Sequence, residues 1–189
     1  MKVFIAGTVD KRINPKYLEG IKKLATLMRE KNYEIMCVGA KTGSIGEMYN
    51  QFVKNDGHVD LIVPVPYADE AKGMKANSAT VVDSLFILQQ IALRNTEATI
   101  VLPGGNGTLA ELYMITDSIK SKFDHDIVII YNVNGFYDKI KEMNQFMFDN
   151  GCLTEAQFEY FTFCDTPEDV MKCLEYWDIK RKNNLKYNN

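Results

Sequence analysis

The chain has 189 residues, 46% of them hydrophobic and 25% charged, which suits one globular domain with a sizeable core. The formal net charge of −3 argues against an extended nucleic-acid-binding face, and no apolar run is long enough to span a membrane. The short apolar N-terminus predicts a strand and not a signal peptide. Four cysteines without metal-type spacing and only two histidines indicate reduced thiols and no metal site, as expected of a cytoplasmic protein.

Short apolar runs alternate with amphipathic segments along the chain. Buried strands are predicted at residues 3–6, 33–38, 59–65, 96–102 and 126–131. Helices are predicted at residues 15–28, 80–94, 108–120, 135–149 and 154–160, from residue 46 to residue 53, and from the N-cap signature at 165–168 to residue 177. This alternation predicts a doubly wound α/β domain over residues 1–178, with a mainly parallel sheet and helices on both faces. We expect a flexible tail at 179–189, and the polar, irregular connection at 66–79 has the composition of a functional loop.

Three loops rich in small residues follow the first, second and fourth predicted strands. In α/β sheets, ligands bind beyond the carboxyl ends of the strands, where these loops lie. A helix that starts after a glycine turn also presents backbone N–H groups without internal partners, which favours a phosphate. The candidate phosphate-binding or nucleotide-binding residues are Gly7, Thr8, Gly39, Lys41, Gly43, Ser44, Gly104, Gly105, Asn106, Gly107 and Thr108.

The glycines have a second interpretation, because they could serve only to make tight turns from strand to helix. Neither long loop is a standard nucleotide fingerprint. The 39–46 loop lacks the Gly-Lys-Ser/Thr ending of a P-loop, and 104–107 does not fit the dinucleotide pattern. Kinase, ATPase and dehydrogenase functions are therefore disfavoured.

Glu111 is the most informative carboxylate in the chain. It lies three residues after Thr108, so the two could form a capping box at the start of the helix. Alternatively, the carboxylate could lie beside a bound sugar phosphate. It could then stabilise an oxocarbenium-like transition state or position a water against the anomeric carbon, as carboxylates do in glycosidic chemistry.

The segment Pro103-Gly104-Gly105-Asn106-Gly107-Thr108-Leu109-Ala110-Glu111 resembles the PGGxGTxxE motif of the "Lonely guy" family, which was long described as lysine decarboxylases. The resemblance covers most of the chain, and its further matches are Pro15 and Tyr17, the 39–46 loop, the Gly-Phe-Tyr-Asp segment at 135–138 and the Thr-Pro-Glu helix start at 166–168. It implies a Rossmann-like fold, usually a homodimer. It implies a phosphoribohydrolase activity that releases the base from a cytokinin riboside 5′-monophosphate, with residues 104–108 on the 5′-phosphate and Glu111 in catalysis. No residue context suggests a lysine that would hold pyridoxal phosphate, and we expect no cofactor.

One position departs from the family pattern. The family pairs its glutamate with an arginine in a Met-His-x-Arg-Lys stretch, which aligns with residues 85–89 here and places Leu88 at the arginine position. A working enzyme then needs another cation, and Lys41, Arg12 and Lys75 are the candidates. Gln89 and Arg94 are further candidate ligand contacts on the same predicted helix.

We therefore expect a nucleoside 5′-monophosphate N-glycosidase acting on a small-molecule nucleotide, with Glu111 in catalysis. The alternative is a non-catalytic protein of the same fold that binds or carries a nucleotide or a molybdenum cofactor, a function that Leu88 favours. A third is base transfer, with Glu111 as a covalent nucleophile. The apolar stripe predicted on a helix from Val81 to Leu93 could be plain core or could pack against a second subunit, and the resemblance favours the second.

Overall fold

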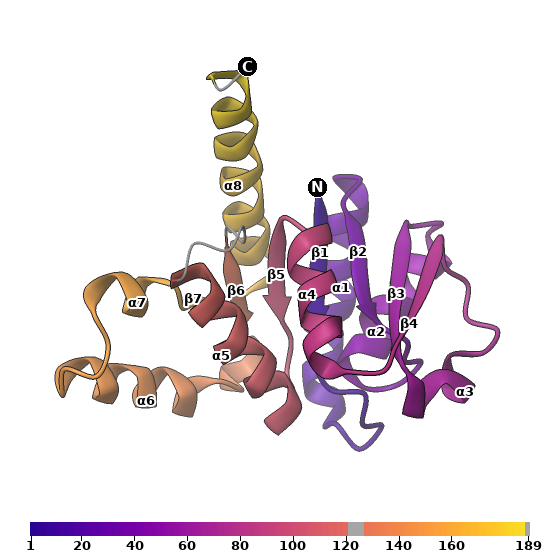
Figure 1. The fold of residues 1–189 in the computed structure, drawn as a ribbon, viewed down its shortest axis with the longest axis horizontal. Coiled ribbons are helices and arrows are strands. Elements are labelled where there is room, and N and C mark those ends of the chain that lie inside the picture. Colours follow the sequence, from indigo (N-terminus) through magenta and orange to yellow (C-terminus); the bar gives the residue numbers. More distant parts are fainter. Residues whose placement is uncertain (121–126, 188–189) are drawn as a thin grey trace.

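The computed structural model describes residues 1–120 and 127–187. Within these ranges, seven strands form one sheet in the order β4-β3-β2-β1-β5-β6-β7, and every neighbouring pair is parallel. The predicted α/β class with a parallel sheet is therefore confirmed (Figure 1). The strands are β1 (Lys2–Ala6), β2 (Glu34–Val38), β3 (Val59–Pro64), β4 (Ser78–Val82), β5 (Ala98–Val101), β6 (Val128–Tyr131) and β7 (Thr162–Cys164).

Helices cover both faces of the sheet (Figure 1). The α-helices are α1 (Leu18–Glu30), α2 (Gly43–Lys54), α3 (Ala68–Ala71), α4 (Leu85–Asn95), α5 (Asn106–Lys120), α6 (Asp138–Asp149), α7 (Glu155–Glu159) and α8 (Pro167–Tyr187), and the short 3-10 helices are η1 (Pro15–Tyr17), η2 (Val65–Tyr67) and η3 (Val133–Gly135). None of the helices in the described ranges is both long and apolar enough to cross a bilayer.

The alternation of side chains along the strands divides the core into two layers. In β1, Val3 and Ile5 belong to a buried cluster that includes side chains of α1, α2 and α8. Phe4 and Ala6, which point to the opposite face, belong to a second cluster with α4 and α5. Because both faces are covered, the inner strands β1, β2, β3, β5 and β6 are mostly apolar and buried, as in other parallel sheets.

The segment around residue 80 differs from the sequence prediction. A helix was expected over 80–94, but Ser78–Val82 is an edge strand, and α4 begins only after Ser84, whose Oγ accepts a hydrogen bond from the Phe86 amide at 3.2 Å. The first four residues of β4 are exposed, so Val81 does not continue an apolar helical stripe. Thr80, Val81 and Val82 are β-branched residues, which favour strands, and the backbone of this segment pairs with β3.

The C-terminal part of the chain also differs. The short strand β7 pairs with β6 and was not predicted. Helix α8 continues to Tyr187, so residues 179–187 are helical where a loose tail was expected, and 188–189 lie outside the described residues. The predicted start of the strand at residue 126 also lies outside them.

The order of the strands places a topological switch point between β1 and β5. From β1 to β4 each new strand joins one side of the sheet, and the chain then returns so that β5 pairs with β1 on the other side. The connections that leave the carboxyl ends of β1 and β5 therefore diverge, which opens a crevice at this edge. Residues 7–8 and 103–107 form the two sides of that crevice.

Candidate functional site

A cavity of about 480 Å³ opens at the switch point. Its lining comes from the loops after β1, β2 and β5 together with α4, α5 and the η2–α3 segment. Of the predicted site residues, it brings together Gly7, Thr8, Gly39, Gln89, Gly105, Gly107, Thr108 and Glu111. Its volume lies within the usual range of small-molecule sites, roughly 300–1,000 Å³.

Ser44 hydrogen-bonds to the loops after β1 and β5 and holds them together. Its buried Oγ accepts a hydrogen bond from the Thr8 amide at 2.9 Å and donates one to the Pro103 carbonyl at 2.7 Å. The Thr8 amide also donates to the Pro103 carbonyl at 3.2 Å. Ser44 does not line the cavity, so the structure gives this predicted phosphate ligand an internal role in holding the β1 and β5 loops together.

Gly43 likewise has a structural role. Its φ of +77° is unfavourable for other residues, and a side chain there would overlap the Thr8 carbonyl. It brings the start of α2 against the β1 loop, where the Ile45 amide donates to the Thr8 carbonyl at 3.2 Å. Gly43 is therefore explained by a tight turn, the second interpretation offered for the loop glycines.

The glycines of the β5 loop divide into two kinds. A side chain at Gly104 would overlap Thr108, so packing explains that glycine. At Gly105 and Gly107, an added Cβ would meet nothing within 4 Å, and neither residue has a positive φ. Neither packing nor backbone conformation requires these two glycines, and both line the cavity. They leave open space in front of the first amides of α5, where an anion is favoured.

Helix α5 begins at Asn106, earlier than predicted, and the Leu109 amide donates to the Gly105 carbonyl at 3.0 Å. Thr108 therefore lies inside the first turn and is not the N-cap, so the capping-box interpretation of Thr108 and Glu111 is wrong. In the described part of the chain, the Glu111 carboxylate has no hydrogen-bond or ion-pair partner. Burial without a partner raises the pKa of Glu111 to about 7.

Tyr137 supports the glycine loop from behind. Its buried hydroxyl donates to the Leu102 carbonyl at 2.7 Å and also receives a hydrogen bond from the Gly104 backbone. Burial, and less strongly the nearby Glu111 carboxylate, raise the pKa of Tyr137, which keeps the hydroxyl protonated. The residue belongs to the Gly-Phe-Tyr-Asp segment, but its position under the loop was not foreseen.

Gln89 and Leu88 occupy the α4 wall of the cavity. Leu88 is 1% exposed and packs in the second core cluster, so the position of the family arginine is apolar. Gln89 is 4% exposed, and its buried Oε1 has no hydrogen-bond partner among the described residues. An unpaired buried carbonyl is costly, and this one lies on a residue that lines the cavity.

The cations proposed to replace the family arginine do not line this cavity, whose described lining has no lysine or arginine. Lys41 is exposed, with its Nζ 3.5 Å from the Lys72 carbonyl, and Lys75 pairs with Asp56 at 3.0 Å. Arg94 is exposed in the last turn of α4. Arg12 lines a neighbouring cavity, described below. Asn106 is exposed at the first position of α5 and lines neither cavity.

Sequence reasoning missed several residues of the cavity lining, among them two polar ones. Tyr67 and Glu70 come from η2 and α3, inside the 66–79 connection whose composition suggested a functional loop. The composition of residues 66–79 predicts a functional segment but does not identify these two residues. Glu70 gives the cavity a second carboxylate in addition to Glu111.

The chain is thus a doubly wound α/β protein with a glycine-rich turn, a helix N-terminus and an unpaired carboxylate at its switch point. It belongs to the family described as "Possible lysine decarboxylase", whose model matches residues 44–174, well over half of the chain. A probable cytokinin riboside 5′-monophosphate phosphoribohydrolase of Oryza sativa subsp. japonica is 27% identical over 92% of this chain and 70% of its own length. A cytokinin riboside 5′-monophosphate phosphoribohydrolase of Arabidopsis thaliana is 26% identical over 84% of this chain and 75% of its own length. The resemblance to the "Lonely guy" family is confirmed.

Solved structures share the fold. A molybdenum cofactor binding protein of Rippkaea orientalis superimposes with a TM-score of 0.69 at 16% identity, covering 93% of this chain and 95% of its own. The Moco carrier protein of Chlamydomonas reinhardtii gives a TM-score of 0.69 at 13% identity, covering 95% of this chain and 98% of its own. At these identities the likeness concerns the fold alone.

The family description implies pyridoxal phosphate, but the cavity does not fit that cofactor. Its described lining contains no lysine that could hold the cofactor covalently. No group of three or more His, Cys, Asp or Glu residues suited to a metal occurs in residues 1–120 and 127–187.

Proposed function

We propose that the protein hydrolyses the N-glycosidic bond of a nucleoside 5′-monophosphate and releases the free base and ribose 5-phosphate. The observation that carries the proposal is Glu111, a carboxylate without a partner among the described residues, in a cavity that also contains a helix N-terminus and two glycines that packing does not require. The family membership and the phosphoribohydrolase relatives support the same chemistry.

In this proposal, the 5′-phosphate lies on the first amides of α5, beside Gly105 and Gly107. Helix α5 points its N-terminus at the phosphate, so the helix dipole compensates part of the negative charge. The Thr108 hydroxyl adds a donor on the same turn. The absence of lysine and arginine from the described lining makes these neutral donors the main anchor.

Glu111 lies one helical turn beyond Thr108 and faces the ribose in the same proposal. The bond between the anomeric carbon and the base nitrogen breaks, and the ribose gains oxocarbenium character that an ionised Glu111 stabilises. Water attacks the anomeric carbon, and Glu111 takes a proton from that water. The protonated Glu111 then gives this proton to the nitrogen of the leaving base, which restores the carboxylate. A pKa near 7 suits a group that must accept and release a proton at neutral pH.

A screen of nucleoside 5′-monophosphates with detection of free base tests the proposal. We expect release by the wild type, and a loss of about 100-fold or more in Glu111→Gln, which keeps the shape but cannot ionise. Glu70→Gln is the matched control, because it removes the other carboxylate of the cavity and should retain activity. Full turnover by Glu111→Gln would refute the mechanism.

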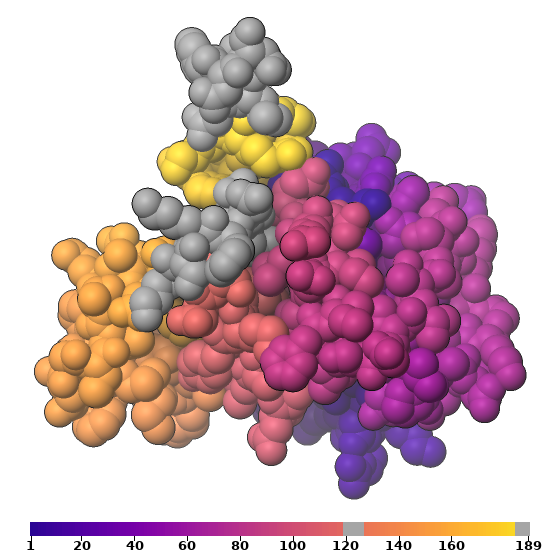
Figure 2. Space-filling view, viewed as in Figure 1, coloured from indigo at the N-terminus to yellow at the C-terminus, as the bar shows by residue number. Residues whose placement is uncertain are grey.

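We also propose that the cavity lies at the interface of a homodimer. Apolar side chains are exposed around its mouth, including Tyr67 at 49%, Leu85 at 66% and Phe86 at 75%. Figure 2 shows the α4 region at the surface of the near face of the molecule. Exposed apolar clusters of this kind mark interaction sites. Phe86→Asp should convert a dimer into a monomer in light scattering, whereas a monomeric wild type would refute this part.

The second candidate function is binding or carriage of a nucleotide or molybdenum cofactor without cleavage. Leu88 favours it, because the apolar residue removes the cation that the family places beside its glutamate. A carrier should copurify with its ligand, visible in the absorbance spectrum of the protein, and should bind nucleotides without releasing base. Release of base that depends on Glu111 would exclude this function.

A further inference from the structure

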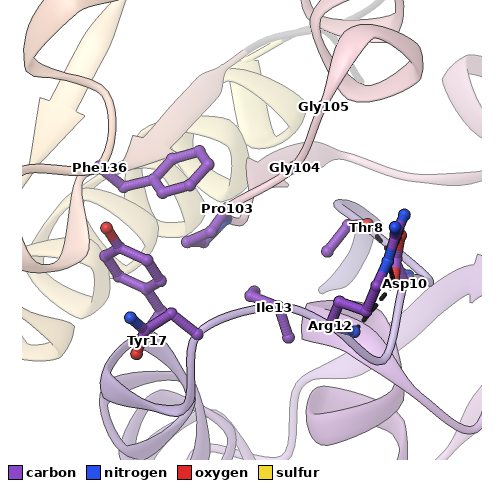
Figure 3. Close-up of a pocket in the computed structure, with 10 residues that line it drawn as sticks. Thr8, Asp10, Arg12, Ile13, Tyr17, Pro103, Gly104, Gly105 and Phe136 are labelled. Carbon is purple, nitrogen blue, oxygen red and sulfur yellow. Dashed lines mark hydrogen bonds and ion pairs between the residues drawn. The ribbon is translucent and has the colours of Figure 1, made fainter.

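A second cavity, of about 400 Å³, lies beside the connection between β1 and α1 (Figure 3). Its floor is Pro103 and the two glycines that follow. Figure 3 shows Tyr17 and Phe136 on one side, and Asp10 and Arg12 on the other. Nothing in the proposed hydrolysis uses this cavity.

The two cavities meet across the β5 loop, since Thr8 and Gly105 line both. Gly105 is one of the two glycines of the β5 loop where an added side chain would meet open space. The two cavities are therefore neighbours at Gly105, a residue that contributes no side chain to either.

The aromatic side of the second cavity is rigidly built. The Tyr17 and Phe136 rings pack edge to face with their centroids 5.0 Å apart, and Phe136 packs against Tyr137 in the same way at 4.8 Å. Tyr137 in turn bonds to the β5 loop at Leu102. This arrangement holds an apolar wall at a fixed distance from the glycine turn, where a planar ring can lie against it.

The polar side presents the guanidinium group of Arg12, whose side chain is 85% exposed and is held by Asp10. Arg12 Nε donates to both Asp10 carboxylate oxygens at 3.0 Å, and Nη2 donates to Oδ2 at 2.5 Å. Arg12 lowers the pKa of Asp10 to about 2, so the pair stays charged at any physiological pH. The Nη1 group has no partner among the described residues, and it leaves N–H donors for an oxyanion.

From these features we propose that the ligand spans both cavities and is a pyrophosphate-linked nucleotide. One phosphate lies on the α5 N-terminus, the chain crosses Gly105, and the second phosphate meets Arg12. The group beyond it rests against the wall of Tyr17 and Phe136. This inference rests on the proposed nucleotide site and assigns that site a longer ligand than a nucleoside monophosphate.

Calorimetry with adenosine 5′-monophosphate and adenosine diphosphoribose tests the inference, in the full chain carrying Glu111→Gln so that neither ligand is cleaved. We expect the diphosphate ligand to bind about tenfold more tightly. Adding Arg12→Gln should remove most of that advantage and change the monophosphate Kd less than about twofold. Lys11→Gln, which removes the neighbouring exposed charge outside the cavity, should change neither affinity.

The outcomes separate the two proposals. The proposal of a ligand that spans both cavities is wrong if the two ligands bind equally tightly, or if the diphosphate ligand still binds more tightly in Arg12→Gln. Either result is compatible with the proposed monophosphate site. Failure of both ligands to bind overturns the nucleotide site as well.

Discussion

The hydroxyl of Ser44 donates a 2.7 Å hydrogen bond to the carbonyl of Pro103, 59 residues away in the chain. The same oxygen accepts from the Thr8 amide, so one buried atom joins the start of α2 to the loops after β1 and β5. The width of the crevice at the switch point therefore depends on Ser44.

Ser44→Ala should lower the free energy of unfolding by about 1–3 kcal/mol, because it removes the partner of buried backbone groups. Ligand affinity should fall with it, since the loops lose their fastening. Ser118→Ala is the matched control. Among the described residues its hydroxyl bonds only to the Met114 carbonyl within α5, and alanine favours a helix. Equal unfolding curves for the two variants in urea would contradict the role given to Ser44.

Alanine at Gly105 and Gly107 should separate binding from folding. We expect neither Gly105→Ala nor Gly107→Ala to lower the free energy of unfolding, and Gly107→Ala could raise it by up to about 1 kcal/mol through helix propensity. Affinity for ribose 5-phosphate should fall about tenfold or more, because each methyl group enters the space in front of the α5 amides.

Gly104→Ala provides the contrast. Its methyl group overlaps Thr108, so this variant should be destabilised by about 1–3 kcal/mol. Retained affinity in Gly105→Ala and Gly107→Ala would mean that no ligand approaches the turn.

Local patterns predicted much of this molecule from the sequence. The apolar run of β1 and the helical spacing of Ile21, Leu24 and Met28 gave the elements correctly, because those side chains are fully buried. The prediction fails at the edge strand β4, whose first two residues fall in the expected 66–79 connection and whose last three fall in the expected helix, since four of its five residues are exposed and burial leaves no pattern there. Its backbone pairing with β3 decides its structure, and that pairing is not local.

In the candidate site, too, local features follow from the sequence and non-local contacts do not. The sequence predicts that the glycine turn and Glu111 lie close together because they are adjacent in the chain, and Gly105, Gly107 and Glu111 line one cavity. The internal role of Ser44 was not predicted, because its partners Thr8 and Pro103 lie far along the chain. Of the two interpretations offered for Thr108 and Glu111, the capping box fails because the helix begins at Asn106, which places Thr108 within its first turn.

The rate of hydrolysis should depend on the ionisation of Glu111. With a pKa of about 7 and the ionised form active, kcat/KM should rise about tenfold per pH unit below 7 and level off above it. A series of rates from pH 5 to pH 9 on the best substrate checks this. A rate that falls as the pH rises through 7 would instead assign the protonated form to catalysis.

The same ionisation should destabilise the fold at high pH. The unfolded carboxyl group releases its proton near pH 4.5, whereas the folded one holds it to about pH 7. Stability is therefore lost between these values as the pH rises. Glu111→Gln has no such loss, so its advantage should be near zero at pH 4 and reach on the order of 3 kcal/mol above pH 7. Urea unfolding of the wild type and of Glu111→Gln, at pH 4 and above pH 7, measures this difference in stability. A difference that does not change with pH would show that folding does not raise the pKa of Glu111.

Gln89→Leu should stabilise the protein and weaken ligand binding. The buried Oε1 has no described partner, so replacing the amide by an apolar side chain of similar size removes a desolvation cost of about 1–3 kcal/mol. In the complex we expect the ligand to pair with this oxygen, so Gln89→Leu should also lower the affinity for the nucleotide about tenfold. Gln90→Leu is the matched control, because Gln90 is the exposed neighbour on the same helix and should leave affinity unchanged. Thermal unfolding with and without nucleotide reads both effects at once. A Gln89→Leu protein that binds as tightly as the wild type would mean that the Oε1 atom faces no ligand, and α4 would then contribute only its apolar wall to the cavity.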